Sequence, residues 1–509
     1  MNSLINKRNV FIVVGIMVFI FLLGGSYALW KYVSTANADI NTITHGLDYY
    51  INYTKGQDIT SGVLNQSFDY TGGNSTDIEL WKKDNTYDIY GHIYLDVEEI
   101  GSNLRKASSL KYVVLSGENI ISSGSLRGIN QGKKVLLKGD IPLMTSKQVF
   151  TVYIWLDITE ETDESVSGET LDISVVCDAT MMELGLPNYD GTRDIIVDKI
   201  RDMYNNATKT VVTNNGVRYN YATSVNLMED ADGNIRYYGA NPNNYIYFNC
   251  SDYSNQSSAT CEVWRIIGVF GDNLKIMRSG SIGSYSWDNK DDTSGSEGSY
   301  GKNDWSDARI MKLLNPGYTT QSIGGSLYYN SKSGNCYANG ANAYTSCDFT
   351  NSGLKNETTR ALIEEMTWNL GAHSSMGVYP NQIYQYERGT NVYSGRPTTW
   401  NGKVTLPYAS DYAYAADLRS CNSQLSSYSN SNCTSTNWMK SVFGSQRLVW
   451  LLTTSSANSH YVWYVEPTGN LNVNSAFGVP EIFPTAYLDF SSSVLSGTGT
   501  STNPYMLNV

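Results

Sequence analysis

The sequence predicts a mostly β protein in which an N-terminal β-sandwich is followed by an α+β region. Apolar and polar residues alternate over 87–97, 110–115 and 150–158, and this period of two is typical of strands with one buried face. The chain is rich in Tyr (39) and Gly (44), and only 17% of its residues are charged. That composition favours extracellular β structure with long loops over a cytosolic enzyme.

The chain is too long for one ordinary core, because 509 residues exceed the roughly 250–300 at which single cores stop growing. We divide it into four parts by pattern and composition. These are an export segment (1–33), the β-sandwich (34–180), a junction with a helix (181–210) and an α+β domain tied by disulfides (211–509).

The export segment has two basic residues followed by an uncharged apolar run over 10–30. If it is a signal peptide, Ser26 and Ala28 stand at the −3 and −1 positions of a cut before Leu29. If it is not cut, the run has the length of one membrane-spanning helix, and the basic residues keep the N-terminus inside. Both interpretations place the rest of the chain outside the cell, either secreted or held at the cell surface.

Six of the seven cysteines form three close pairs, and none of the pairs has the CxxC spacing of a zinc or redox motif. We predict three local disulfides, each worth about 3 kcal/mol by loop entropy, in an exported chain. The predicted pairs are Cys250 with Cys261, Cys336 with Cys347, and Cys421 with Cys433. Cys177 is left over in an alternating apolar run, so we predict a buried core thiol rather than a nucleophile.

The run over 150–158 predicts one set of inward and one set of outward side chains in the sandwich. The inward set is Phe150, Val152, Ile154, Leu156 and Ile158, and the outward set is Tyr153 and Trp155.

Two segments of this part carry a family resemblance: "LLGGSYALWKYVSTANADINTITHGLDYYIN" near the N-terminus and the later "VFTVYIWLDITEE". They resemble the camelysin-type proteins of Gram-positive bacteria, a family that includes a fibre protein of the biofilm matrix. The resemblance implies export, a single jelly-roll-like sandwich and self-association through it. Camelysins have been classed as metallopeptidases, but His45 and His92 stand alone here and no HExxH motif occurs. We therefore carry over location and fold, and no catalysis.

After the sandwich, a helix is expected from a cap at Thr192 to Asn206, with one apolar stripe that packs against a domain. Three more helices are expected over 304–315, 356–370 and 410–420, the second ended by Gly371. Strands are expected over 245–249, 261–270, 448–455, 462–467, 470–474 and 485–490, with a hairpin turn at 271–273.

The α+β part also resembles known proteins, through "WRIIGVF", "SIGSYSWDN", "WLLTTSSAN…YVWYV…G" and the terminal "SGTGTSTNPY". These motifs are similar to those of an uncharacterised class of C-terminal domains in exported Firmicutes proteins. Those domains look distantly like the C-type-lectin and formylglycine-generating-enzyme folds, in which a late aromatic hairpin supports a surface built from loops. The sequence departs from the class at "FGVPEIFPTAYL", where similar domains have an Arg-Pro pair. The role of that arginine is therefore not carried over.

The sequence offers few groups of residues that could form a catalytic site. The four histidines (45, 92, 373 and 460) are scattered, and no phosphate-binding glycine motif occurs. We therefore predict that the chain is not an enzyme. The formal net charge of −12 leaves no basic footprint for nucleic acid.

Metal binding has one candidate, an acidic Gly/Ser-rich loop with Asp288, Asp291, Asp292 and Asp304. Carboxylates in such a loop are possible ligands for Ca²⁺, the one ion we consider as a cofactor. The alternative is a solvated acidic loop. The run 230–234 also begins like a calcium loop but lacks the closing Glu, so we favour an Asp-Gly turn between strands.

The stretch 450–478 is the candidate binding region, because it combines aromatic rings with Ser, Asn and His. The candidate ligand-binding residues are Ser455, Asn458, His460, Tyr461, Tyr464, Glu466 and Asn470. Glu466-Pro467 resembles part of a lectin Glu-Pro-Asn loop, but two residues separate it from Asn470, so an ordinary hairpin turn is favoured.

We therefore expect an adhesion or ligand-binding protein whose C-terminal domain takes a surface glycan or protein. The alternative is a structural subunit of extracellular fibres or biofilm matrix, in which the sandwich self-associates. If the export segment is uncut, the membrane is a further partner.

Overall fold

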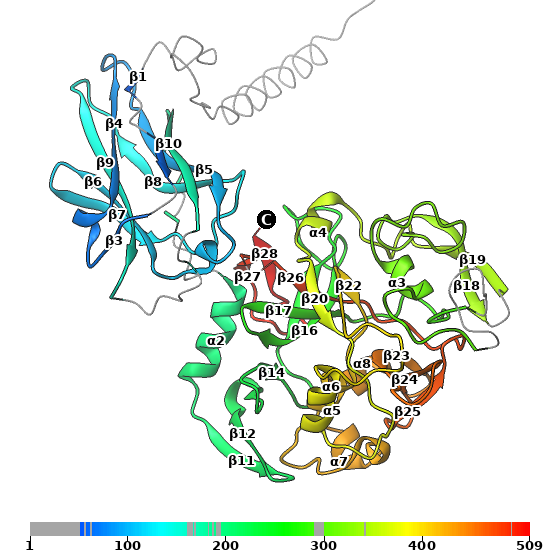
Figure 1. The fold of residues 1–509 in the computed structure, drawn as a ribbon. Coiled ribbons are helices and arrows are strands. Elements are labelled where there is room, and N and C mark those ends of the chain that lie inside the picture. The colour runs from blue at the N-terminus through cyan, green and yellow to red at the C-terminus, as the bar shows by residue number, and fades with distance from the viewer. Residues whose placement is uncertain are drawn as a thin grey trace, which may run out of the picture. The chain divides into compact units, whose positions relative to one another are not determined.

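The computed structural model describes residues 51–54, 58–61, 64–159, 166, 169–181, 183–185, 188–189, 195–289, 300–339, 343–489 and 491–508. The predicted export segment (1–33) lies outside these residues. The chain divides into two compact units, Met1–Arg193 and Asp194–Val509 (Figure 1). The prediction of a mostly β protein with several sheets is confirmed.

Unit 1 holds two sheets. Six strands form one sheet in the order β1-β4-β9-β6-β7, with β3 parallel to β9, and four form the other in the order β2-β10-β5-β8. All other pairs in these sheets are antiparallel. The strands are β1 (Ile51–Thr54), β2 (Ile59–Ser61), β3 (Gln66–Ser67), β4 (Asn74–Lys82), β5 (Tyr90–Ile100), β6 (Leu110–Ser116), β7 (Asn119–Ser125), β8 (Lys134–Pro142), β9 (Gln148–Asp157) and β10 (Leu171–Thr180).

The apolar faces of both sheets share one core, to which β9 contributes Val152 and Ile154 and β5 contributes Leu95, all fully buried. One prediction on the 150–158 run is wrong: Ile158 was expected inward but lies beyond the end of β9 and is 40% exposed. Once the strand ends, its alternation no longer decides which way a side chain points. Trp155 is only 8% exposed, yet it lies outside the core that the two sheets share and packs edge-to-face on Tyr70, as its outward prediction requires.

Cys177 of β10 lies in this core and is the free cysteine of the chain. Burial raises the pKa of its thiol far above the ordinary value. The prediction of a buried core thiol is confirmed, since a thiol that does not ionise is a poor nucleophile.

Unit 2 is built on a nine-stranded sheet in the order β11-β12-β13-β14-β16-β17-β26-β22, with β15 also paired to β16. Its strands are β11 (Thr210–Asn214), β12 (Val217–Ala222), β13 (Leu227–Glu229), β14 (Ile235–Tyr237), β15 (Tyr245–Phe248), β16 (Glu262–Phe270), β17 (Asn273–Arg278), β22 (Val404–Thr405) and β26 (Thr485–Leu488).

Four smaller sheets complete the strands of unit 2: β18-β19, β20-β21, β23-β24-β25 and β27-β28. Their strands are β18 (Ser333–Asn339), β19 (Ala343–Asp348), β20 (Met366–Asn369), β21 (Thr399–Gly402), β23 (Val449–Thr454), β24 (Tyr461–Val465), β25 (Leu471–Ser475), β27 (Ser493–Ser496) and β28 (Met506–Asn508). The helices are α2 (Ile196–Asn206), α3 (Arg309–Leu314), α4 (Glu357–Ala361), α5 (Pro380–Glu387), α6 (Ala409–Tyr414), α7 (Ser431–Thr434) and α8 (Trp438–Phe443). In Figure 1, α5 and α6 lie together beside β23.

The expected junction helix is confirmed as α2, although its predicted cap, Thr192, lies outside the described residues. The helices expected over 304–315 and 410–420 are present but shorter, as α3 and α6. The helix expected over 356–370 is wrong in its second half, because α4 ends at Ala361 and Met366–Asn369 forms β20. Pairing of β20 with β21 outweighs the helix propensity of the run before it.

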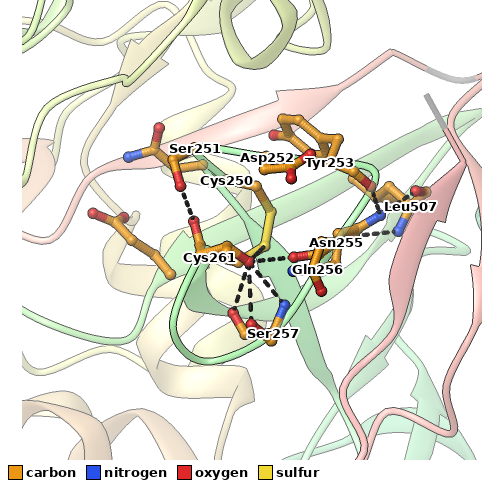
Figure 2. Close-up of a disulfide and its surroundings, with 12 residues drawn as sticks. Cys250, Ser251, Asp252, Tyr253, Asn255, Gln256, Ser257, Cys261 and Leu507 are labelled. Atoms are coloured by element: carbon orange, nitrogen blue, oxygen red, sulfur yellow. Dashed lines mark hydrogen bonds between the residues drawn. A yellow bond between two sulfur atoms is a disulfide. The ribbon is translucent and has the colours of Figure 1, made fainter. Parts of the chain in front are cut away.

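All three predicted disulfides are present: Cys250–Cys261, Cys336–Cys347 and Cys421–Cys433. Figure 2 shows the first, whose loop binds the C-terminal strand β28. Gln256 donates from its amide to the carbonyl of Leu507 and accepts from the Leu507 amide at 2.9 Å. The Gln256 side chain thus bonds to β28 as a neighbouring strand would. It links this strand to the disulfide loop.

Candidate binding surface

The seven candidate ligand-binding residues lie at the two ends of the β23-β24-β25 sheet. Ser455, Asn458, His460 and Tyr461 belong to the β23–β24 connection or the first residue of β24, whereas Tyr464, Glu466 and Asn470 lie at the β24–β25 turn. Four residues of an extended strand span about 13 Å, so the structure does not bring the seven together.

The β23–β24 connection is held in place by Asn303, a residue only 2% exposed. Its side-chain amide donates to the carbonyl oxygens of Ser455 (3.1 Å), Asn458 (2.7 Å) and Tyr461 (3.1 Å). Its backbone amide donates to the carbonyl of Ser459 at 2.9 Å. These bonds satisfy the carbonyls of Ser455, Asn458 and Ser459, add a second donor to the carbonyl of Tyr461, and fix the loop without helix or strand.

Arg396 supports the same loop from another segment of the chain. Its Nε donates to Oδ1 of Asn303 at 3.2 Å, and a terminal nitrogen donates to the carbonyl of Ser459 at 3.1 Å. Neither Asn303 nor Arg396 was predicted as a site residue. The sequence carries no local signal for them, because they lie 155 and 63 residues from their partners Asn458 and Ser459.

Four rings form a ladder over this loop. Tyr300 stacks on His460 with centroids 4.6 Å apart and an interplanar angle of 21°, and on Phe477 at 6.1 Å and 24°. His460 contacts Tyr461 edge-to-face at 4.7 Å. Tyr300 and Tyr461 are 49% and 36% exposed, so two rings of the ladder reach solvent. We call this surface the loop face. It consists of Tyr300, Arg396, Asn458, His460, Tyr461 and Phe477.

Ser455 is the candidate that the structure removes from the surface, because it is only 3% exposed. Its backbone amide donates to the carbonyl of Tyr461 and its hydroxyl accepts from Ala457, so it closes the loop from inside. Asn458 is half-buried, and its Oδ1 accepts from the amide of His460 at 3.0 Å.

At the other end, Glu466 forms the hairpin turn that was favoured for it. Its amide donates to the carbonyl of Asn470 at 2.8 Å and its carbonyl accepts from Gly469 at 2.9 Å. Its carboxylate accepts from the side chains of Thr468 and Asn472. Asn470 Oδ1 accepts from the Ser429 amide at 2.7 Å, and Tyr464 packs edge-to-face on Trp450. The side chains of Glu466 and Asn470 are thus engaged at the turn, and that of Tyr464 packs against the neighbouring strand β23.

An open polar groove of about 540 Å³ lies next to this turn. Hydroxyl groups and one ammonium line it, from Thr434, Ser435, Lys440, Ser441, Ser445 and Thr468. The ammonium of Lys440 donates to the carbonyl of Gly444 at 2.7 Å.

The acidic loop is only partly described, since Asp291 and Asp292 lie outside the described residues. Asp288 is 2% exposed and accepts from the Lys302 amide at 2.8 Å, and burial raises its pKa to about 7. Asp304 is engaged by Ser306 and by the ammonium of Lys302 at 3.2 Å. In the part of the chain that the structure describes, no three His, Cys, Asp or Glu side chains are grouped to hold a metal.

The turn favoured for 230–234 is confirmed between β13 and β14. Asp230 Oδ1 accepts from the amides of Asp232 and Asn234, each at 3.0 Å, and Oδ2 accepts from Nε of Arg236 at 2.6 Å. With its oxygens committed to backbone and guanidinium, Asp230 acts as a buried turn residue.

No protein-family model matches the chain, and no curated protein matches it significantly. The three disulfides are typical of an oxidising, extracellular environment. Across the described residues, no helix has both the length and the apolar character needed to span a membrane.

Proposed function

We propose that this is an exported cell-surface protein that binds a ligand, glycan or protein, through the loop face of unit 2. The observation that carries the proposal is the fixation of an irregular surface loop by Asn303 and Arg396. A loop ordered before binding loses little conformational entropy when a ligand arrives. Tyrosine rings beside Asn and Arg are the residue types that dominate such binding surfaces.

The arrangement of the four rings indicates which parts of them we assign to contact with the ligand. Tyr300 stacks on both His460 and Phe477, so we assign its edge and hydroxyl to contact with the ligand. Tyr461 is contacted edge-on by His460 and is the ring we assign to direct stacking or apolar contact. Arg396 and the Asn458 side chain supply polar contacts beside it.

Analogies to two known folds, one for each unit, support this proposal. We infer a jelly-roll-like arrangement of the two sheets of unit 1 and a C-type-lectin-like arrangement of unit 2, as the resemblances to camelysin-type proteins and to exported Firmicutes domains imply. In the lectin-like arrangement a late aromatic hairpin carries the binding loops, which is the position of β24 and β25 in this chain. The N-terminal segment would keep the protein at the membrane if it is not cut.

Arrays of glycans and of extracellular proteins test the proposal, with the chain from Leu29 onward as the probe. Binding is expected, and Tyr461→Ala and Arg396→Ala should each weaken it at least tenfold. Tyr344→Ala is the matched control, because Tyr344 is a 58% exposed tyrosine on β19, which belongs to a different sheet from β24. Loss of binding in the control, or no binding with and without Ca²⁺, would contradict the proposal.

The alternative, a fibre subunit, is favoured by an edge of unit 1. The strand β7 is the last of the described six-stranded sheet, and Ile120 on it is 54% exposed. Exposed edge strands can pair with a second copy of a chain. Filaments of the purified chain in electron micrographs, abolished by Ile120→Lys, would support this function.

A further inference from the structure

The core of unit 2 contains a charged pair that neither the loop face nor the disulfides account for. Lys275 on β17 and Asp411 in the first turn of α6 are both fully buried, with 0% of each side chain exposed. Their Nζ and Oδ2 atoms are 2.5 Å apart, although the residues are 136 positions apart in the chain.

The second oxygen of the carboxylate faces another cation. Nη1 of Arg236 lies 3.4 Å from Oδ1 of Asp411, and the amide of Tyr408 donates to Oδ2 at 3.0 Å. Burial alone would raise the pKa of Asp411, but Lys275 and Arg236 hold it below its usual range. The resting state is therefore an ammonium–carboxylate ion pair.

Aromatic rings surround the ammonium and exclude water from it. Nζ of Lys275 is 4.3 Å from the ring centroid of Tyr408, and three further rings lie within 6 Å. These are Trp368 (5.3 Å), Phe270 (5.5 Å) and Tyr487 (5.6 Å). Burial lowers the pKa of Lys275 to about 8, against the opposing effect of Asp411. The cost of keeping this amine charged is thus unusually high for a lysine.

We propose that Lys275 and Asp411 join in an intramolecular amide bond. The ammonium passes one proton to Oδ2, which gives a neutral amine next to a carboxylic acid. Nζ then attacks Cγ, and Arg236 stabilises the negative charge that forms on Oδ1. A second proton from nitrogen goes to the departing Oδ2 hydroxyl, the Cγ–Oδ2 bond breaks, and one water leaves. Atoms and charges balance without an oxidant or other co-reactant.

Two features make this pair different from an ordinary surface ion pair at the same distance. The absence of water lowers the free-energy cost of the neutral amine–acid form relative to the resting ion pair, and the guanidinium is already placed for the oxyanion. The reaction needs to occur only once in each molecule, so a slow step suffices. The product would fasten β17 to α6 by a bond that reducing agents do not break.

The intact mass of the full-length protein, purified without reductant, tests this proposal on the native chain. The expected mass is lower by one water than that of the chain with three disulfides. Trypsin should then fail to cut after Lys275 and should release one branched peptide that joins residues 266–278 to residues 404–419.

Lys275→Gln and Asp411→Ala should each restore the full mass, and the mass is informative even if a variant is unstable. The pair Lys312 and Asp307 is the internal control, because its Nζ and Oδ1 are also 2.5 Å apart but are 12% and 34% exposed. No branched peptide is expected there. A native mass without the loss of water would overturn the proposal, and so would a loss of water with normal cleavage after Lys275.

Discussion

At the scale of single residues, the loop face depends on side chains that are themselves hidden. Asn303 is 2% exposed, yet it donates to three carbonyls of the loop that carries His460. Asp288 lies below the same region, and its backbone amide donates to the carbonyl of Ala476, next to Phe477. The exposed rings are therefore positioned by the side-chain amide of Asn303 and by the backbone amide of Asp288, both of them buried residues.

Asn303→Asp tests this dependence, because it keeps the shape of the side chain but removes its donors. We expect it to lower the free energy of unfolding by about 2–4 kcal/mol, since buried carbonyls lose their partners and a charge is added. Urea titration measures the loss, and hydrogen exchange of residues 455–461 should rise. Asn472→Asp on half-buried β25 is the control and should cost less. Equal protection of the loop in both variants would contradict the assigned role.

Asp288→Asn gives a prediction with a defined sign in pH. The folded-state pKa of about 7 lies above the ordinary 3.8, so the folded protein holds this proton more tightly than the unfolded chain. The free energy of unfolding therefore falls as pH rises from about 4 to about 7. The complete loss is about 4 kcal/mol.

The asparagine variant does not titrate, so it should be more stable than the native protein above pH 7. The difference should shrink toward pH 4. Thermal unfolding between pH 4 and pH 9 measures it, and a difference that is constant with pH would show that the carboxyl group of Asp288 does not titrate in this range.

At the scale of elements, the hairpin of β24 and β25 decides which residues can act together. Its five-residue strands place the loop face at one end and the Glu466 turn at the other. The turn is tight, because Gly469 has φ = 101° and a Cβ there would come within 2.7 Å of Thr434.

Gly469→Ala should therefore destabilise the protein by about 1–3 kcal/mol, through backbone strain and the clash with Thr434. Differential scanning calorimetry measures the effect. Thr468→Ala at the exposed neighbouring position is the control and should have a small effect. Binding through the loop face should survive in Gly469→Ala while the variant is folded, since the change lies at the far end of the hairpin.

The loop closed by the Cys250–Cys261 disulfide holds the strand β28 through the side chain of Gln256. Replacing Gln256 by Ala should leave the amide and carbonyl of Leu507 unpaired at a buried position and cost about 2–3 kcal/mol. Hydrogen exchange of Met506–Asn508 should rise in the variant. Ser257→Ala in the same loop should leave β28 protected, and equal exchange in both variants would contradict the clamp.

At the scale of the whole molecule, strand periodicity could be predicted from the sequence and long-range support could not. The alternation over 150–158 located β9 and its inward set up to Leu156, because period-two burial is a local property. Asn303 could not be recognised, because its partners lie more than 150 residues away. Strand β20 was read as helix, because its pairing with β21 is likewise invisible to a local pattern.

The candidate site shows the same limit. His460 and Tyr461 were predicted from their residue types and do lie on one surface. Glu466 and Asn470 were grouped with them by closeness in sequence, yet a strand separates the two sets. Tyr300 completes the ladder from a segment 160 positions earlier, and only the fold brings it to His460.

The thiol content of the whole chain gives a further prediction. The native protein should not react with a thiol reagent, because Cys177 is buried and the other six cysteines are paired. One thiol per chain should react after denaturation without reductant, and seven after reduction. More than one reactive thiol before reduction would show that a disulfide is missing from the protein in solution.

The three disulfides join cysteines only 11 or 12 positions apart, and this spacing has a consequence for how an exported chain matures. If the chain is exported from its N-terminus, each of these six cysteines would meet its own partner before the first cysteine of the next pair emerges. Cys177 would emerge before all of them, so it is the one thiol that could compete with Cys261 for Cys250 until unit 1 folds and buries it.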